Sequence, residues 1–169
     1  MPKLVVAVAL PAEQQLRTTE ALDCKEDFVF TRKGAQAYTT LDELRGKRVG
    51  ITRGYPYARE VTANKNFVID EALSDEANIR KLMAGRIDAF VLDEKTGLKA
   101  FEALELTAQM QYDPSKPVSR QEVYVAFRDT PGGRVLAKQF SDGLRKLKSS
   151  GRYQAITKGI TFAAGCSGR

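Results

Sequence analysis

The chain has 169 residues, of which 43% are hydrophobic and 28% are charged, and its formal net charge is +6. These proportions exclude a disordered or collagen-like chain and are typical of one globular domain, or slightly more than one. The positive charge does not predict a nucleic-acid partner, because the lysines and arginines are interspersed with acids. The chain contains no histidine, which argues against a Cys/His zinc site and against a histidine-dependent catalytic triad.

The N-terminal region begins with an apolar stretch, Leu4–Leu10, that predicts a buried strand. A signal-peptide core is the alternative, although seven residues are at the lower limit for one. Pro11–Lys25 is polar and is interpreted as a connector. Cys24 and Cys166 would form one disulfide in an oxidising compartment, and two unpaired thiols fit the sequence equally well.

The next segment predicts two strands joined by a capped helical turn. Asp27–Arg32 is a strand, with phenylalanines on one face. Thr40 and Glu43 have the spacing of a capping box, and Gly46 ends the turn as a left-handed residue. Lys47–Thr52 then points Val49 and Ile51 at a core, which indicates a buried strand.

A glycine–proline turn follows this strand in the sequence RGYPY, residues 53–57. Proline favours the first position of a helix, so Pro56 predicts that a short helix over 57–64 begins here. The N–H groups at a helix N-terminus attract anions. The turn therefore predicts a binding site for a carboxylate or a phosphate, led by Gly54.

Strands and helices alternate from residue 47 to residue 104, which predicts a parallel sheet with helices on both faces. The remaining part predicts a weak strand, a strong strand, a long helix begun by Pro131 and a final helical turn. The expected elements after residue 66 are strands Phe67–Glu71, Ile87–Leu92, Leu106–Tyr112 and Glu122–Phe127, and helices Asp75–Ala84, Glu94–Leu104, 131–150 and Arg152–Lys158.

Ligands of such sheets bind beyond the carboxyl ends of the strands. Two strand ends carry suitable chemistry: the turn with Gly54, Tyr55 and Tyr57, and the carboxylate of Asp93. Together they fit a zwitterion, whose anionic end meets the turn and whose ammonium meets Asp93. The alternatives remain open that Asp93 only caps the next helix and that both tyrosines are ordinary surface or core residues.

Three phrases together, TLDELRGKRVGITRGY, SDEANIRKLMAGRIDAFVLDEKTG and EVYVAFRDT, resemble the family 3 extracellular solute-binding proteins, the amino-acid receptors of ABC transporters. The resemblance covers about residues 28–159 and implies a type II periplasmic-binding-protein fold in the α/β class. It implies that Gly54, Tyr55 and Tyr57 bind the ligand α-carboxylate through backbone N–H groups and that Asp93 binds the α-amino group. Pro56 departs from the small hydroxyl residue usual in the family, and so does Tyr55.

The resemblance also implies a division of the chain: 1–26 as a remnant of the first lobe with a connector, 27–36 as a crossing strand, 37–121 as the second lobe, 122–160 as the return strand with C-terminal helices, and 161–169 as a tail. Most of the first lobe has no counterpart, and Gln14 stands where a carboxylate-clamping arginine falls. A truncated chain, a degenerate paralogue and half of an assembly all fit. We expect weak or no amino-acid binding by the chain alone and homodimerisation by strand exchange.

The function implied is that of a periplasmic substrate-binding component, or a fragment of one, which binds an amino-acid-like solute and partners a membrane permease. No cofactor, metal, catalytic residue or nucleic-acid partner is expected. One alternative is an enzyme on the same scaffold, such as a dehydratase or murein-cleaving relative, for which Glu60, Asp93 and Glu94 are the available acids. The other alternative is the ligand-sensing domain of a receptor.

Overall fold

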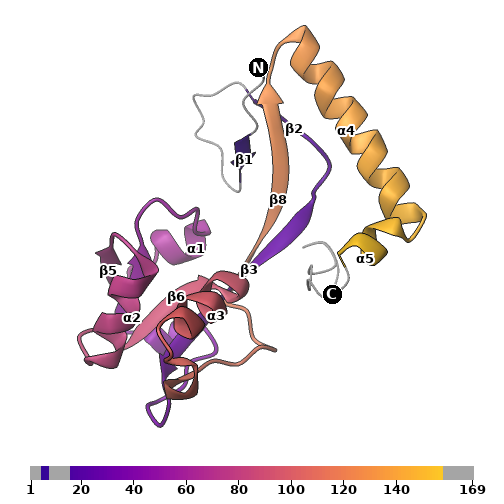
Figure 1. Ribbon diagram of the computed structural model, residues 1–169. Helices are drawn as coiled ribbons and strands as arrows, with labels where there is room; N and C mark the ends of the chain where they lie inside the picture. The colour runs from indigo at the N-terminus through magenta and orange to yellow at the C-terminus, as the bar shows by residue number, and fades with distance from the viewer. Residues whose placement is uncertain (1–4, 8–15, 158–169) are drawn as a thin grey trace. The chain divides into compact units, whose positions relative to one another are not determined.

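The computed structural model describes residues 5–7 and 16–157. The chain divides into two compact units: the central unit is Glu26–Arg120, and the terminal unit is formed by the described residues before and after it. Each boundary of this division lies within a long strand: the first within β3 (Asp23–Arg32) and the second within β8 (Ser119–Arg128), which Figure 1 labels. The chain therefore passes from one unit to the other along these two long strands.

The central unit contains a mixed sheet in the order β3-β6-β4-β5. Strand β4 (Arg48–Thr52) is parallel to both β5 (Val68–Ala72) and β6 (Ala89–Asp93), whereas β3 is antiparallel to β6. The predicted parallel arrangement is thus confirmed for these three strands. The expected strand over 106–112 is mostly wrong, because only β7 (Met110–Gln111) is extended and a 3-10 turn, η2 (Thr107–Gln109), precedes it.

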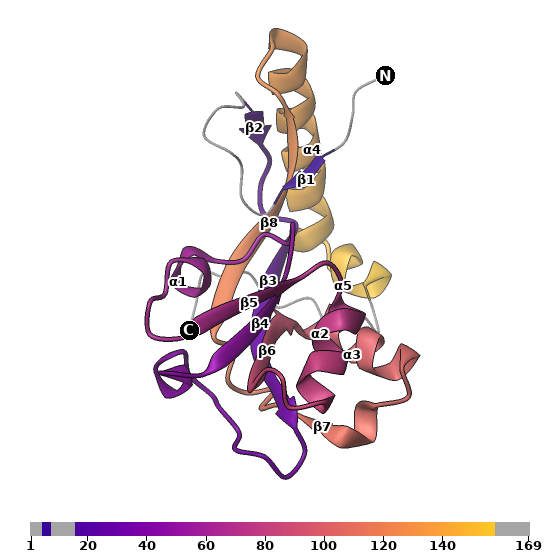
Figure 2. The ribbon, with the colours of Figure 1, turned by 90° about the vertical axis from the view of Figure 1, so that its left-hand side faces the viewer.

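Helices cover both faces of this sheet because successive strand residues point to opposite sides. One face packs on the turn η1 (Asp42–Leu44) and on α1 (Arg59–Thr62); its core includes Val29, Val49, Ile51, Leu44 and Val61. The other face packs on α2 (Asp75–Met83) and α3 (Glu94–Ala103); its core includes Phe28, Phe30, Phe90, Leu92, Ile79, Leu82 and Phe101. Figure 2 shows α1 on one side of β4 and β6 and both α2 and α3 on the other.

The predicted capping box of the central unit is confirmed by hydrogen bonds. The Glu43 carboxylate accepts from the Thr40 N–H at 3.1 Å, and the Glu43 N–H donates to the Thr40 hydroxyl at 3.4 Å, which is the reciprocal pair of a capping box. Gly46 has a φ of 74° and ends this turn. The Ser74 hydroxyl accepts from the Ala77 N–H at 3.2 Å and so begins α2.

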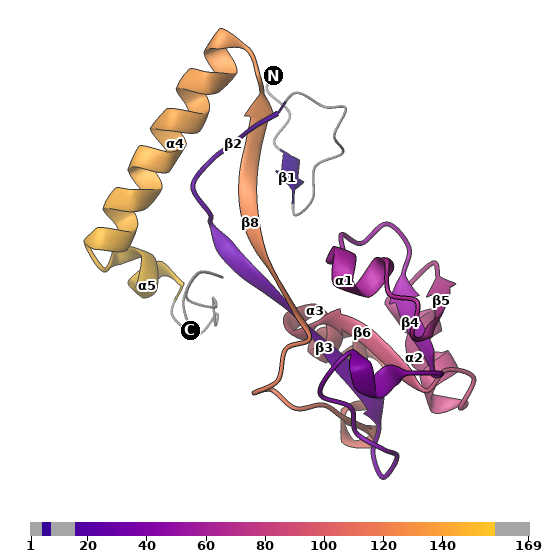
Figure 3. The same cartoon turned by 180° about the vertical axis from the view of Figure 1, so that it is seen from behind.

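The terminal unit is built around β8. Two three-residue strands, β1 (Val5–Ala7) and β2 (Leu16–Thr18), pair with it antiparallel. After a turn capped by the Thr130 hydroxyl, helix α4 (Pro131–Ser149) folds back along β8 and β2, and α5 (Arg152–Ile156) follows Gly151 (Figure 3).

The expectation that 11–25 is a connector is wrong for two parts of it, since 16–18 forms β2 and 23–25 begins β3. Pairing with β8 orders this polar stretch, and such tertiary context overrides a weak local pattern. Cys24 is buried and disulfide-bonded. The expected tail and Cys166, like most of 4–10, lie outside the described residues. Within the described part of the chain, no helix has the length and apolarity that crossing a membrane requires.

Candidate functional site

The candidate site is the edge of the central sheet at which β4 and β6 both end. Because β4 and β6 are parallel, with Val49 opposite Ala89, their carboxyl ends meet at one edge (Figure 2). The turn after Thr52 and the Asp93 side chain therefore lie close together. The negative charge of Asp93 reaches Tyr55 strongly enough to contribute to a raised pKa of that phenol, after the larger effects of burial and of Asp75.

The turn after β4 does not have the predicted helix terminus. Gly54 has a φ of 79°, which a glycine adopts without strain. The Tyr55 N–H donates to the Thr52 carbonyl at 3.3 Å, and the Tyr57 N–H donates to the Tyr55 carbonyl at 3.0 Å. Helix α1 starts only at Arg59 and has four residues. A short helix does form within the predicted range 57–64, but the expectation that Pro56 begins it is wrong, because the turn is closed by its own backbone bonds.

Tyr57 is a core residue that joins β4 to β6. Its side chain is 7% exposed. Its hydroxyl accepts from the Thr52 N–H and donates to the Val91 carbonyl, each at 3.0 Å. Burial raises the pKa of this phenol, and the nearby charge of Asp27 adds to that effect. Tyr57 therefore fixes the end of β4, which places the turn that follows.

Tyr55 lies at the surface of the same edge, with 39% of its side chain exposed. Its hydroxyl donates to the Asp75 Oδ2 at 2.9 Å, and its ring stacks on the Tyr57 ring with centroids 6.4 Å apart. The Thr52 hydroxyl donates to the other oxygen of Asp75 at 2.6 Å. Asp75 thus holds both the Tyr55 ring and the end of β4 in place.

Asp75 and Thr52 were not predicted as site residues. Asp75 stands in the first turn of α2, where an acid is expected for the helix dipole alone. The topology could have indicated this contact. Helix α2 follows β5, and because β5 is parallel to β4, the start of α2 lies near the carboxyl end of β4. The contact also needs α2 to pack on β4, where Asn78 donates to the Ile51 carbonyl at 2.9 Å and to the Thr52 hydroxyl at 3.1 Å.

Asp93 does cap α3, as the open alternative stated. Its Oδ1 accepts from the Thr96 N–H at 3.0 Å and from the Thr96 hydroxyl at 2.9 Å. Its Oδ2 accepts no hydrogen bond within the described residues, so one carboxylate oxygen can still accept from a ligand. Capping and ligand binding are therefore compatible for this side chain.

A third carboxylate, Asp27, lies opposite Asp93 in the β3–β6 register. It is 1% exposed, and its Oδ2 accepts from the Ser119 hydroxyl at 2.8 Å. Three carboxyl groups, those of Asp27, Asp75 and Asp93, thus lie at this edge of the sheet. Within the described residues, no group of His, Cys, Asp or Glu has an arrangement that could hold a metal ion.

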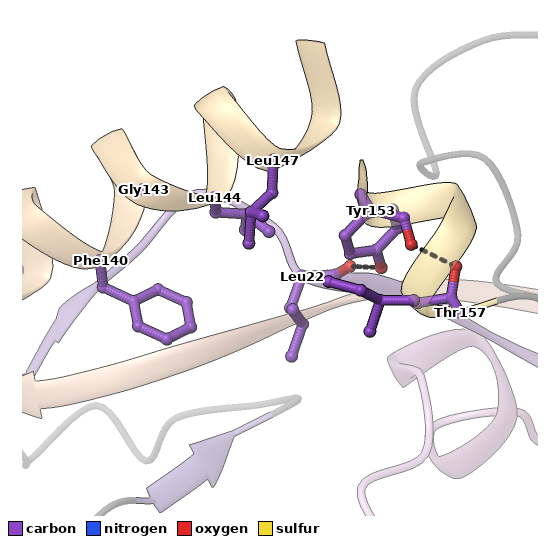
Figure 4. A pocket seen from close by; sticks show the side chains of 8 residues that line it. Leu22, Phe140, Gly143, Leu144, Leu147, Tyr153 and Thr157 are labelled. Carbon is purple, nitrogen blue, oxygen red and sulfur yellow. Dashed lines mark hydrogen bonds between the residues drawn. The ribbon is translucent and has the colours of Figure 1, made fainter. Parts of the chain in front are cut away.

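A separate apolar groove lies in the terminal unit, between α4, α5 and the residues that lead into β3 (Figure 4). Its volume is about 420 Å³, and two of its lining residues are joined by a hydrogen bond that the Tyr153 hydroxyl donates to the Leu22 carbonyl at 2.6 Å. Its lining contains none of the predicted site residues; the lining residues are Leu22, Phe140, Gly143, Leu144, Leu147, Tyr153, Ile156 and Thr157.

Comparison with known proteins finds relatives among amino-acid-binding proteins. No protein-family model matches it. The L-cystine-binding protein TcyJ of Escherichia coli (strain K12) is 30% identical over 120 residues, which cover 70% of this chain and 43% of that protein. The lysine/arginine/ornithine-binding periplasmic protein of Escherichia coli (strain K12) is 25% identical over 153 residues, which cover 86% and 58%. The chain is a homologue of amino-acid periplasmic binding proteins.

Solved structures show the fold of this periplasmic-binding-protein homologue. A mutant of ArgBP from T. maritima superposes with a TM-score of 0.70 at 21% identity, over 92% of this chain and 67% of that one. A histidine kinase sensor domain with similarity to periplasmic binding proteins gives 0.71 at 22% identity, over the same shares. The predicted type II periplasmic-binding-protein fold is confirmed. The homologue spans about half the length of the curated relatives it matches.

Proposed function

We propose that the chain is the substrate-binding component of an ABC transporter, or a part of one, and that its central unit binds a small amino-acid-like solute. The observation that carries this proposal is the placement of the 52–57 turn and Asp93 at one carboxyl edge of the sheet. The relatives support it, since those described above are named for cystine and for lysine, arginine and ornithine, and another solved relative is bound to arginine.

Each site residue has a distinct role in this proposal. The free oxygen of Asp93 accepts from the ligand ammonium, and the exposed ring of Tyr55 forms a wall beside it. Gly54 allows the chain to turn, and Tyr57 holds the turn in position from within the core. The chain acts in the periplasm, without catalysis, and delivers its solute to a membrane permease.

The decisive variant is Asp93→Asn, because asparagine caps a helix as well as aspartate does but carries no charge. A hydrogen bond to a charged group contributes about 1.5–3 kcal/mol, so this change weakens ligand binding by at least about tenfold while the fold is retained. Asp88→Asn is the matched control, since Asp88 precedes β6 at its other end and pairs with Arg48.

Binding is measured by following the amide NMR signals of the chain during titration with lysine, arginine, ornithine, histidine and cystine. Affinities of about 1 mM are expected, because the carboxyl edge of the central unit by itself covers a ligand from one side. Equal affinities of the wild type and Asp93→Asn would return Asp93 to the role of a helix cap. Micromolar affinity for the isolated monomer would contradict the one-sided site.

Homodimerisation is a second part of the proposal, and strand exchange through the terminal unit is its expected form. Its support is apolar exposure along α4 and α5, where Leu136, Phe140 and Ile156 are all exposed. Light scattering after gel filtration should show a dimer that Phe140→Ser weakens. Val68→Ser, which changes an exposed apolar residue of the central unit, is the control and should leave the dimer intact. A monomer at all concentrations would exclude this part.

A receptor sensor domain is the second candidate function, and the superposition on the histidine kinase sensor domain favours it. The two candidates differ in their genomic surroundings. Permease and ATPase genes beside the reading frame would support transport. A reading frame that continues into a membrane span and a kinase domain would support the sensor.

A further inference from the structure

The carboxyl edge of the central sheet offers few hydrogen-bond donors to a ligand. Between Gly54 and Tyr57, the N–H groups of Tyr55 and Tyr57 both donate to carbonyls of the turn itself. Pro56 has no N–H to donate. Of these four residues, Gly54 alone has an N–H that makes no hydrogen bond to a described residue.

The hydroxyl donors of the edge are engaged as well. Thr52 and Tyr55 both donate to the Asp75 carboxylate. Tyr57 donates to the Val91 carbonyl. A ligand carboxylate is bound by several donors that point at it. These hydroxyl groups instead donate to acceptors of the protein, so they are not available to a ligand carboxylate.

One acceptor of the edge, an oxygen of Asp93, is by contrast available. The Asp93 Oδ2 accepts no bond from a described residue, and neither Asp75 nor Asp93 forms an ion pair within the described part of the chain. The exposed Tyr55 ring, fixed by its hydroxyl on Asp75, offers the face that cations prefer. A cationic group thus finds the available oxygen of Asp93, a fixed aromatic ring and the nearby carboxylate of Asp75 at one place.

We propose that this edge binds an ammonium or guanidinium group and does not bind a carboxylate, and that Pro56 sets this preference. The inference rests on the proposed function. It narrows the ligand to compounds with a cationic amine or guanidinium group, which bind at this edge whether or not they carry an α-carboxylate. Pro56 acts as a specificity-determining residue because any other residue there would add one N–H, and a threonine would add a hydroxyl as well.

The test compares two pairs of ligands that differ by the carboxylate: lysine with cadaverine, and arginine with agmatine. Each is titrated into the full chain, and the amide signals of Thr52, Gly54 and Thr96 are followed. We expect each amine to bind about as tightly as its amino acid or more tightly, so that its dissociation constant is at most about three times that of the amino acid. An amino acid that binds more than tenfold tighter than its amine would overturn the inference and leave the proposed function standing.

The variant Pro56→Thr should shift the ratio toward the amino acids by at least threefold, because it restores a donor in the turn. Pro114→Thr, in the exposed loop before β8, is the matched control and should leave the ratio unchanged. An unchanged ratio in Pro56→Thr would remove Pro56 from the proposal. If none of the four compounds moves the signals of the edge at concentrations well above the expected affinity of about 1 mM, the proposed function itself is refuted.

Discussion

Tyr57→Phe tests whether the end of β4 is fixed by one buried hydroxyl. The substitution keeps the ring and removes the group that joins the Thr52 N–H to the Val91 carbonyl. Both partners are backbone groups at buried residues, and a buried group left without its partner costs about 1–3 kcal/mol. The expected loss in the free energy of unfolding is therefore about 1–3 kcal/mol. For a chain of this length, each kcal/mol lowers the melting temperature by about 2–4 °C.

The assay is urea unfolding of the wild type and the variant, with the transition of the central unit followed separately if the two units unfold apart. Tyr38→Phe is the matched control, because Tyr38 lies in the same core and its hydroxyl makes only a long contact of 3.5 Å with Gln36. We expect the control to change stability by less than about 0.5 kcal/mol. Equal stability of wild type and Tyr57→Phe, or equal losses in both variants, would refute the bridging role of the hydroxyl.

Two further predictions concern stability. Burial and then the hydrogen bond to Glu94 raise the pKa of Tyr112 to about 12. As the pH rises from about 10 toward 12, the unfolded chain releases this proton first, so the free energy of unfolding falls, and Tyr112→Phe should reduce that fall in urea titrations at several pH values. Gly50→Ala should cost about 1–3 kcal/mol, because its Cβ would lie 2.6 Å from the Ile87 side chain. In Gly132→Ala the added Cβ would meet nothing within 4 Å, so this substitution should leave the free energy of unfolding unchanged or raise it by up to about 1 kcal/mol.

The elements that the sequence predicts well are those specified by their own residues. Helix α2 begins at Asp75, and helix α4 begins at Pro131, both at the predicted residue. Strand β6 carries a continuous apolar run, which only a position covered on both faces accepts, and β4 alternates apolar Val49 and Ile51 toward the core. Local pattern and global fold agree for these elements, and the pattern is then sufficient.

The elements that the sequence predicts poorly depend on partners far away along the chain. Strand β2 is polar and largely exposed, and pairing with β8 more than a hundred residues later defines it. The contact from Asp75 to Thr52 and Tyr55 likewise exists only because α2 packs on β4. No local signal reports such a contact, because an acid in the first turn of a helix is expected for the helix dipole alone.

The turn RGYPY shows why site residues are harder to predict than strands. Tyr55 and Tyr57 are the same residue type and lie two positions apart, yet Tyr55 is 39% exposed and Tyr57 is 7% exposed. The left-handed Gly54 and the two backbone bonds of the turn decide which ring enters the core. The residue turned inward determines stability, and the residue turned outward is available to a ligand. Binding and folding are therefore separable at this edge, and single substitutions can test each without the other.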